Sequence, residues 1–295
     1  MRIFVTGASG WIGSAVVPEL ISAGHQVLGL ARSDASAQAI TDMGAEVING
    51  DLNDTGVLRA GTLDSEGVIH LAFVVPSVSE AATRTDAQAI ETFAAALAGS
   101  GQPLMISGAT LVTPGRPATE RDQLIAAGPI AARITNMQAA LAAAARGVRS
   151  GLVMLPRSVH GRGDRHGFIP QLIAAARARG VSGYIGDGTS RWPAVHVKDA
   201  ASLYRLAIEQ APAGAVLNAV GDEGVPVREI AEAIGRRLNL PARSLPAAEY
   251  EGMLAHLLST DMPASSTITR ELLGWKPTRP GLIEDIEQGH YFTSR

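Results

Sequence analysis

Three glycines spaced three residues apart follow the first strand-like segment of the chain. Residues 2–6 are largely apolar, Gly7 comes directly after them, and an apolar helical stretch follows Gly13. Gly7 permits a tight turn, Gly10 lets the backbone approach a pyrophosphate, and Gly13 lets the helix pack closely against the strand. A phosphate placed there meets free N–H groups and the positive end of the helix dipole. The pattern predicts a dinucleotide-binding loop that includes Gly7, Ser9, Gly10, Trp11, Ile12 and Gly13.

The elements that must position this loop alternate between strand and helix along the chain. Such alternation implies a parallel, doubly wound sheet of the Rossmann type, an α/β fold with right-handed crossovers. Ligands of these sheets bind beyond the carboxyl ends of the strands, near the point where the strand order reverses. The expected strands are residues 2–6, 26–31, 46–49, 68–71, 104–107, 151–155 and 216–219, and the expected helices are residues 35–43, 55–60, 79–98, 129–146 and 169–179.

The pattern changes after a stretch rich in glycine and arginine, residues 156–167. From residue 227 onward the chain is mostly helical and is interrupted by prolines. We therefore expect two domains. Residues 1–165 plus about 195–222 form the dinucleotide-binding domain, and about 166–194 plus 223–295 form a smaller, mainly helical C-terminal lobe that binds the substrate.

Composition excludes several classes of function. The 295 residues are 46% hydrophobic and 18% charged, and the formal net charge of -3 gives no reason to expect nucleic acid or an anionic membrane as partner. Cysteine is absent, which removes disulfides, thiol nucleophiles and thiolate zinc sites. The first strand begins too early to leave room for a signal peptide, and no apolar run has membrane-spanning length, so we expect a cytoplasmic protein.

Six fragments of the sequence carry a resemblance to a known family. In that family's order, they are TGASGWIG (6–13), GDLND (50–54), VIHLAF (68–73), MISGAT (105–110), LPRSVHGRGD (155–164) and WPAVHVKDAA (192–201). With them the chain resembles an extended short-chain dehydrogenase/reductase of the NAD(P)-dependent epimerase/dehydratase superfamily. The fragments extend to about residue 220, and they are far more specific for cofactor binding than for the reaction.

The resemblance implies further contacts with the cofactor. The family's GD-Leu fragment approaches the adenine, its HLA fragment lines the cofactor past the phosphates, and the proline after its sixth strand lies beside the nicotinamide amide. The residues at these positions are Asp51, Leu52, Leu71, Ala72, Phe73 and Pro156. For Asp51 the alternative is a cap on the following helix.

The end of the second strand bears on the choice between NADP and NAD. An acidic residue there would bind the ribose 2′-hydroxyl, whereas a cation would neutralise a 2′-phosphate. The chain has Ala31 in the acidic position, followed by Arg32 and Ser33. Asp34 could reach a ribose, but it also suits the N-cap of a helix that begins at residue 35. We therefore expect NADP, with NAD as the alternative.

The chain differs from the family that it resembles in the residues expected to transfer the proton. Most members carry Tyr-x-x-x-Lys on the long helix after strand five, where the lysine lowers the tyrosine pKa for proton transfer. Counted back from residues 146–147, where this helix ends, the tyrosine position falls on Arg133 and the lysine position on Met137. None of the chain's tyrosines lies on that helix or has a lysine four residues later; they are Tyr184, Tyr204, Tyr250 and Tyr291.

Four residues are candidates for the substrate chemistry. The family places a hydroxyl that holds the substrate carbonyl at the end of strand five, where Ser107 and Thr110 lie, although such hydroxyls also cap strand ends. Arg133 cannot exchange a proton near neutral pH, but it could clamp a carboxylate, a phosphate or a developing oxyanion; a solvated helix-surface arginine is the alternative. His160 is the best-placed proton donor, with a structural turn histidine as the alternative. The spacing of His160 and His166 matches no zinc pattern, so we expect no metal.

These residues favour an NADP(H)-dependent oxidoreductase that transfers hydride to or from a small organic substrate, of the carbonyl reductase or dehydrogenase type. One alternative is a nonenzymatic NADP(H)-binding sensor or regulatory protein that keeps the fold without the proton relay. A sugar-type epimerase or dehydratase that uses bound NAD is another alternative. The retained Ser107, Thr110 and Pro156 favour catalysis.

We predict a homodimer. The expected helices of residues 79–98 and 129–146 resemble the pair that forms a four-helix interface in many family members, and their alanines permit close approach. Light scattering at micromolar concentration should give about twice the 30.6 kDa mass of one chain. A mass near that of one chain would refute the dimer.

Overall fold

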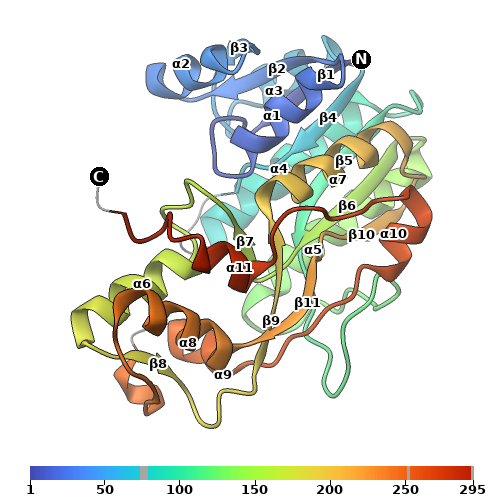
Figure 1. Ribbon diagram of the computed structural model, residues 1–295. Coiled ribbons are helices and arrows are strands. Elements are labelled where there is room, and N and C mark those ends of the chain that lie inside the picture. The colour runs from blue at the N-terminus through green and yellow to red at the C-terminus, as the bar shows by residue number, and fades with distance from the viewer. Residues whose placement is uncertain (74–78, 251–252, 294–295) are drawn as a thin grey trace.

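A seven-stranded parallel sheet forms the centre of the computed structural model, which describes residues 1–73, 79–250 and 253–293 (Figure 1). The strand order is β10-β6-β5-β4-β1-β2-β3, and all neighbours pair in parallel. The strands are β1 (Arg2–Thr6), β2 (Gln26–Ala31), β3 (Glu46–Asn49), β4 (Gly67–His70), β5 (Pro103–Ala109), β6 (Arg149–Leu155) and β10 (Ala215–Asn218). The predicted doubly wound α/β fold is confirmed, and its strand order reverses between β1 and β4.

Helices cover both faces of this sheet. Val16, Ile40 and Tyr204 belong to the apolar core on one face, and Leu58, Phe93 and Ile134 belong to the core on the other. The first face carries α1 (Gly13–Ser22), α2 (Asp34–Asp42) and α7 (Val197–Gln210), and the second carries α3 (Thr55–Leu63), α4 (Glu80–Ala96) and α5 (Ala131–Ala142). The predicted helix of residues 129–146 is α5 with a 3-10 turn at each end, η1 (Gly128–Ile130) and η2 (Ala143–Arg146).

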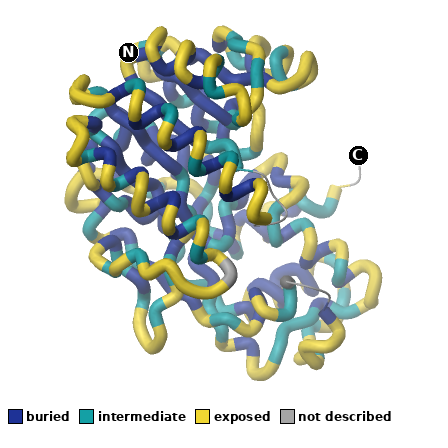
Figure 2. The backbone as a smooth tube through the Cα atoms, turned by 180° about the vertical axis from the view of Figure 1, so that it is seen from behind, coloured by how far each residue is buried: buried dark blue, intermediate teal, exposed yellow. Residues whose placement is uncertain are grey.

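Parts of the second half of the chain build a lobe with a buried core of its own (Figure 2). Trp192 and Ile230 belong to this core. Its helices are α6 (Phe168–Arg179), α8 (Val227–Leu238), α9 (Met253–Ser259) and α11 (Leu282–Glu287), with the 3-10 turn η3 (Ala247–Glu249). The sequence did not predict its small sheets, because these strands either have only three residues or contain proline, which argues against a strand. These strands are β7 (Ser158–His160), β9 (Arg191–His196) and β11 (Asp222–Pro226), and β8 (Ser182–Tyr184) with β12 (Ala242–Ser244).

One part of the proposed C-terminal lobe packs on the large sheet. After α10 (Thr267–Leu273), Trp275 is buried in the core beneath α7, and its Nε1–H donates to the Asp199 carbonyl at 3.1 Å. The predicted division into two domains therefore stays a proposal, with residues 1–165 plus 195–222 in one domain and 166–194 plus 223–295 in the other. In this division, α10 joins the two domains.

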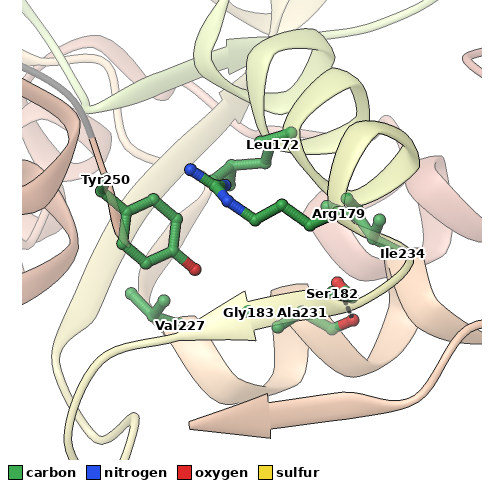
Figure 3. Close-up of a pocket in the computed structure, with 10 residues that line it drawn as sticks. Leu172, Arg179, Ser182, Gly183, Val227, Ala231, Ile234 and Tyr250 are labelled. Carbon is green, nitrogen blue, oxygen red and sulfur yellow. Dashed lines mark hydrogen bonds between the residues drawn. The ribbon is translucent and has the colours of Figure 1, made fainter. Parts of the chain in front are cut away.

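The lobe contains a small cavity between α6, β8 and α8, bounded by Tyr250 (Figure 3). Its volume is about 10 Å³, which is the size of one water molecule and too small for an organic substrate. The Arg179 guanidinium lies over the Tyr250 ring, 4.8 Å from its centroid.

Among the residues that the structure describes, no helix is both long enough and apolar enough to cross a membrane.

A buried polar cluster joins the lobe to the C-terminal segment. His160 Nδ1 lies 3.0 Å from Asp285 Oδ2, and the Tyr291 hydroxyl donates to the same carboxylate at 3.1 Å. Burial alone raises the pKa of Asp285, but the hydrogen bond and charge of His160 outweigh it and leave the pKa below its ordinary value. Burial lowers the pKa values of His196 and His290, which lie beside this cluster, because it disfavours their charged forms.

This cluster predicts a protein that loses stability in mild acid. The unfolded chain takes up protons at His196 and His290 near pH 6.5, whereas the folded chain resists them, so stability falls as the pH drops from about 7 to 5. Below about pH 4 the Asp285 contribution is lost as well, because its folded pKa is depressed. Urea midpoints measured from pH 8 to 5 should fall, and less steeply in His290→Gln than in the surface control His166→Gln. Equal slopes in the two variants would contradict the assignment to His290.

Candidate functional site

The glycine loop after β1 has the geometry that a phosphate cradle needs. Gly7 has φ of 71°, and a Cβ on it would lie 2.8 Å from the Ala72 amide nitrogen. A Cβ on Gly13 would lie 2.2 Å from the Gly7 carbonyl oxygen, so neither position accepts a side chain. Gly10 is exposed, and no side chain caps the first turn of α1. The loop therefore presents backbone and a helix N-terminus that no side chain caps, which fits the pyrophosphate of a dinucleotide.

The segment after β4 lies directly against this loop. The Leu71 amide donates to the Thr6 carbonyl at 3.1 Å, and the Ala72 amide donates to the Thr6 hydroxyl at 3.4 Å. The Trp11 indole donates to the Val159 carbonyl at 2.8 Å, which ties the loop to β7. The structure thus brings the predicted residues 71–73 and the glycine loop together at the reversal of strand order.

The ends of β2 and β3 carry the residues predicted to contact the adenosine half. Of the two roles left open for Asp34, the structure contradicts the helix cap: α2 begins at Asp34 itself, and the Ser33 side chain accepts from the Ser36 amide at 3.2 Å. Arg32 is exposed and forms no side-chain hydrogen bond or ion pair with any described residue, so its charge is available to a ligand.

Asp51 does not cap the helix that follows it. The cap of α3 is Asp54, whose Oδ1 accepts from the Val57 amide at 3.0 Å. Asp51 is exposed, and among the described residues its side chain accepts only from the Asn53 amide at 2.7 Å. Its second carboxylate oxygen remains available to a ligand, and half-buried Leu52 follows it.

Ser107 lies near the end of β5 and bonds to a tyrosine that the sequence analysis set aside. Its hydroxyl lies 3.0 Å from the His70 carbonyl and 2.7 Å from the Tyr204 hydroxyl. Tyr204 is fully buried on α7, and burial raises the pKa of its phenol above the ordinary value. The signal that could have identified it is a polar tip on the largely apolar buried face of α7.

Arg133, which the sequence analysis placed at the family's tyrosine position, is not a solvated surface arginine. Its Nη2 donates to the Ser107 carbonyl at 3.2 Å, and its guanidinium carbon lies 3.8 Å from the Phe73 ring centroid. Nη1 is buried and has no hydrogen-bond partner among the described residues. Burial lowers the pKa of Arg133, but an arginine remains charged at neutral pH. The arrangement holds a partly desolvated cation beside Ser107.

Thr110 and Pro156 follow the neighbouring strand ends. The Thr110 amide donates to the Leu155 carbonyl at 2.9 Å, while its buried hydroxyl has no partner among the described residues. Pro156 is buried immediately after β6. His160 lies elsewhere, fully buried and bonded to Asp285, and it forms no hydrogen bond with Ser107 or Thr110. The structure thus gathers Ser107, Arg133 and Phe73, and it gives His160 a different set of contacts.

A buried network behind the site fixes the helix that carries Arg133. Thr6 Oγ1 lies 2.6 Å from His70 Nδ1, His70 Nε2 lies 3.2 Å from Asp86 Oδ1, and the Asn136 amide donates to Asp86 Oδ2 at 2.7 Å. Burial alone raises the pKa of Asp86, but the hydrogen bonds from His70 and Asn136 lower it below its ordinary value. Because Asn136 is three residues after Arg133, it anchors the same turn of α5.

In the described part of the chain, no group of three acidic or histidine side chains could hold a metal ion.

Comparisons with known proteins agree with this geometry. The family model described as NAD dependent epimerase/dehydratase family matches residues 3–219. An uncharacterised protein of Saccharomyces cerevisiae is 43% identical over 98% of this chain and 99% of its own length. A farnesyl-dihydroquinoline-oxide ketoreductase of Stigmatella aurantiaca is 29% identical over 73% of this chain and 67% of its own. The structure of UDP-glucose 4-epimerase from Thermus thermophilus in complex with NAD is similar in fold, with a TM-score of 0.76 at 18% identity and 100% of each chain covered.

Proposed function

The chain belongs to the NAD dependent epimerase/dehydratase family, and from this premise we propose that it uses NADP(H) to reduce the carbonyl group of a small organic substrate. Its relatives include epimerases and reductases. The observation that carries the proposal is the partly desolvated Arg133 guanidinium beside Ser107, at the edge of the sheet where ligands of this fold bind. A cation and a hydroxyl at that edge suit an oxygen that becomes negative during hydride transfer.

The dinucleotide fits the loops on either side of the strand-order reversal. Gly7, Gly10 and Gly13 leave the space that its pyrophosphate needs, and residues 71–73 extend the same surface. Arg32 would meet a 2′-phosphate, because buried Ala31 offers no carboxylate to a ribose hydroxyl. When bound, the nicotinamide supplies the hydride.

The substrate oxygen is held by the chain's own donors. Ser107 and Thr110 donate hydroxyl hydrogens, and Arg133 stabilises the negative charge that develops on the oxygen. Arg133 cannot deliver a proton, because its guanidinium stays charged. His160 is fully buried and bonded to Asp285, so we assign the proton to water rather than to His160.

Cofactor choice gives one test. NADPH should bind more tightly than NADH, and Arg32→Ala should weaken NADPH by roughly ten- to a hundredfold, the worth of one charge-assisted contact of about 1.5–3 kcal/mol. Fluorescence titration measures both affinities, with Arg243→Ala, an exposed arginine of the lobe, as the matched control. Equal wild-type affinities for the two cofactors, or an Arg32→Ala protein that binds NADPH normally, would refute NADP.

Catalysis gives a second test. On a carbonyl identified by screening aldehydes, ketones and imines for NADPH oxidation, Ser107→Ala and Arg133→Ala should each lower kcat by about a hundred- to a thousandfold. NADPH affinity should stay within a few fold, because neither residue is assigned to the cofactor. Arg84→Ala, an exposed arginine on α4, is the control and should keep full activity. A fully active Arg133→Ala protein would remove Arg133 from the mechanism, and a wild type that oxidises no NADPH across the panel would favour the sensor alternative.

A further inference from the structure

We propose that Tyr204 is a positioning residue, whose buried hydroxyl donates to Ser107 Oγ and makes the Ser107 hydroxyl a donor toward the substrate oxygen. The inference rests on the proposed function, because it concerns the same hydroxyl. Tyr204 does not reach the substrate itself, since its side chain is fully buried beneath the sheet on α7.

The direction of each hydrogen bond follows from what the His70 carbonyl, the Ser107 hydroxyl and the Tyr204 hydroxyl can donate and accept. The His70 carbonyl can only accept, so the hydrogen in the 3.0 Å contact comes from Ser107. The Tyr204 hydroxyl is within 2.7 Å of Ser107 Oγ and has no other hydrogen-bond partner among the described residues. A buried hydroxyl that does not donate loses its solvation without compensation. The phenol therefore donates to Ser107, and Ser107 donates to His70.

This order prepares Ser107 for a carbonyl substrate. When a carbonyl oxygen arrives, the Ser107 hydrogen can rotate from the His70 carbonyl to that oxygen while the phenol keeps donating to Oγ. A hydroxyl that accepts one hydrogen bond is polarised and becomes a stronger donor in the next. The nearby charge of Arg133 acts on the same group of oxygens, because its Nη2 is bonded to the Ser107 carbonyl.

Tyr204 differs in kind from the tyrosine that the family resemblance leads one to expect. Burial raises the pKa of its phenol, and the Ser107 hydrogen bond and the Arg133 charge only partly oppose that rise. The phenol therefore keeps its proton throughout the neutral pH range. It acts as a constant donor, so removing it should lower the rate without moving the pH dependence of kcat.

A double-mutant cycle tests the coupling between the two hydroxyls. Tyr204→Phe keeps the ring and should lower kcat/KM for the carbonyl by roughly tenfold, with NADPH affinity unchanged within a few fold and an unchanged pH profile. In the Ser107→Ala background, Tyr204→Phe should cause almost no further loss, because its effect passes through Ser107. The matched control is Tyr250→Phe, which removes a buried phenol hydroxyl that has no hydrogen-bond partner among the described residues and should leave kcat/KM unchanged. Thermal midpoints of all variants, with activity measured well below them, separate loss of fold from loss of rate.

The outcomes separate the two proposals. An active wild type with a fully active Tyr204→Phe overturns the positioning role and leaves the proposed function intact. The same holds if the losses of the two substitutions multiply, because Tyr204 then acts independently of Ser107. A shifted pH profile in Tyr204→Phe would also overturn the role of a constant donor. A wild type that reduces no carbonyl overturns both proposals.

Discussion

The carboxyl ends of β1 and β4 touch where the strand order reverses, and the placement of the site depends on this contact. Gly7 has no Cβ, so its backbone lies against Ala72, and the Thr6 hydroxyl bonds to the His70 ring at 2.6 Å. The helix after β1, α1, lies on one face of the sheet, and the helix after β4, α4, lies on the other. In doubly wound sheets, the ligand binds in the crevice at such a reversal of strand order. A larger residue at position 7 would separate the loops and widen this crevice at its base.

Buried polar groups connect this contact with α5, the helix that carries Arg133. His70 bonds to Thr6 and Asp86, and Asp86 accepts from Asn136 on α5. Each partner of this chain is buried, so removing one leaves the next without a hydrogen bond. Arg133 lies three residues before Asn136 on α5. The buried bond of Asn136 therefore fixes the part of the helix that positions the Arg133 guanidinium. Buried hydrogen bonds therefore connect the end of β1, which precedes the glycine loop, with the helix that carries Arg133.

The sequence predicted what is local and missed what depends on distant partners. The glycine loop and the seven strands of the sheet follow from short-range spacing and periodicity, and the structure confirms the fold. The bond between Ser107 and Tyr204 joins residues 97 positions apart, and the local sequence around Tyr204 does not identify Ser107 as its partner. The burial of His160 likewise depends on Asp285, 125 positions later. The N-cap at Ser33 instead of Asp34 is an error of one residue at a helix boundary, where such predictions are weakest.

The charges at the crevice argue for a ligand oxygen and against a purely structural role for Arg133. A structural arginine in a protein interior is expected to have its donors paired, because desolvating a guanidinium is costly. Arg133 has one bond to the Ser107 carbonyl and stacks on Phe73, yet Nη1 has no partner among the described residues. Asp86, the nearby carboxylate, is already bonded to His70 and Asn136. The described residues thus offset the charge of Arg133 only in part, and a negative oxygen beside Ser107 would supply a further partner.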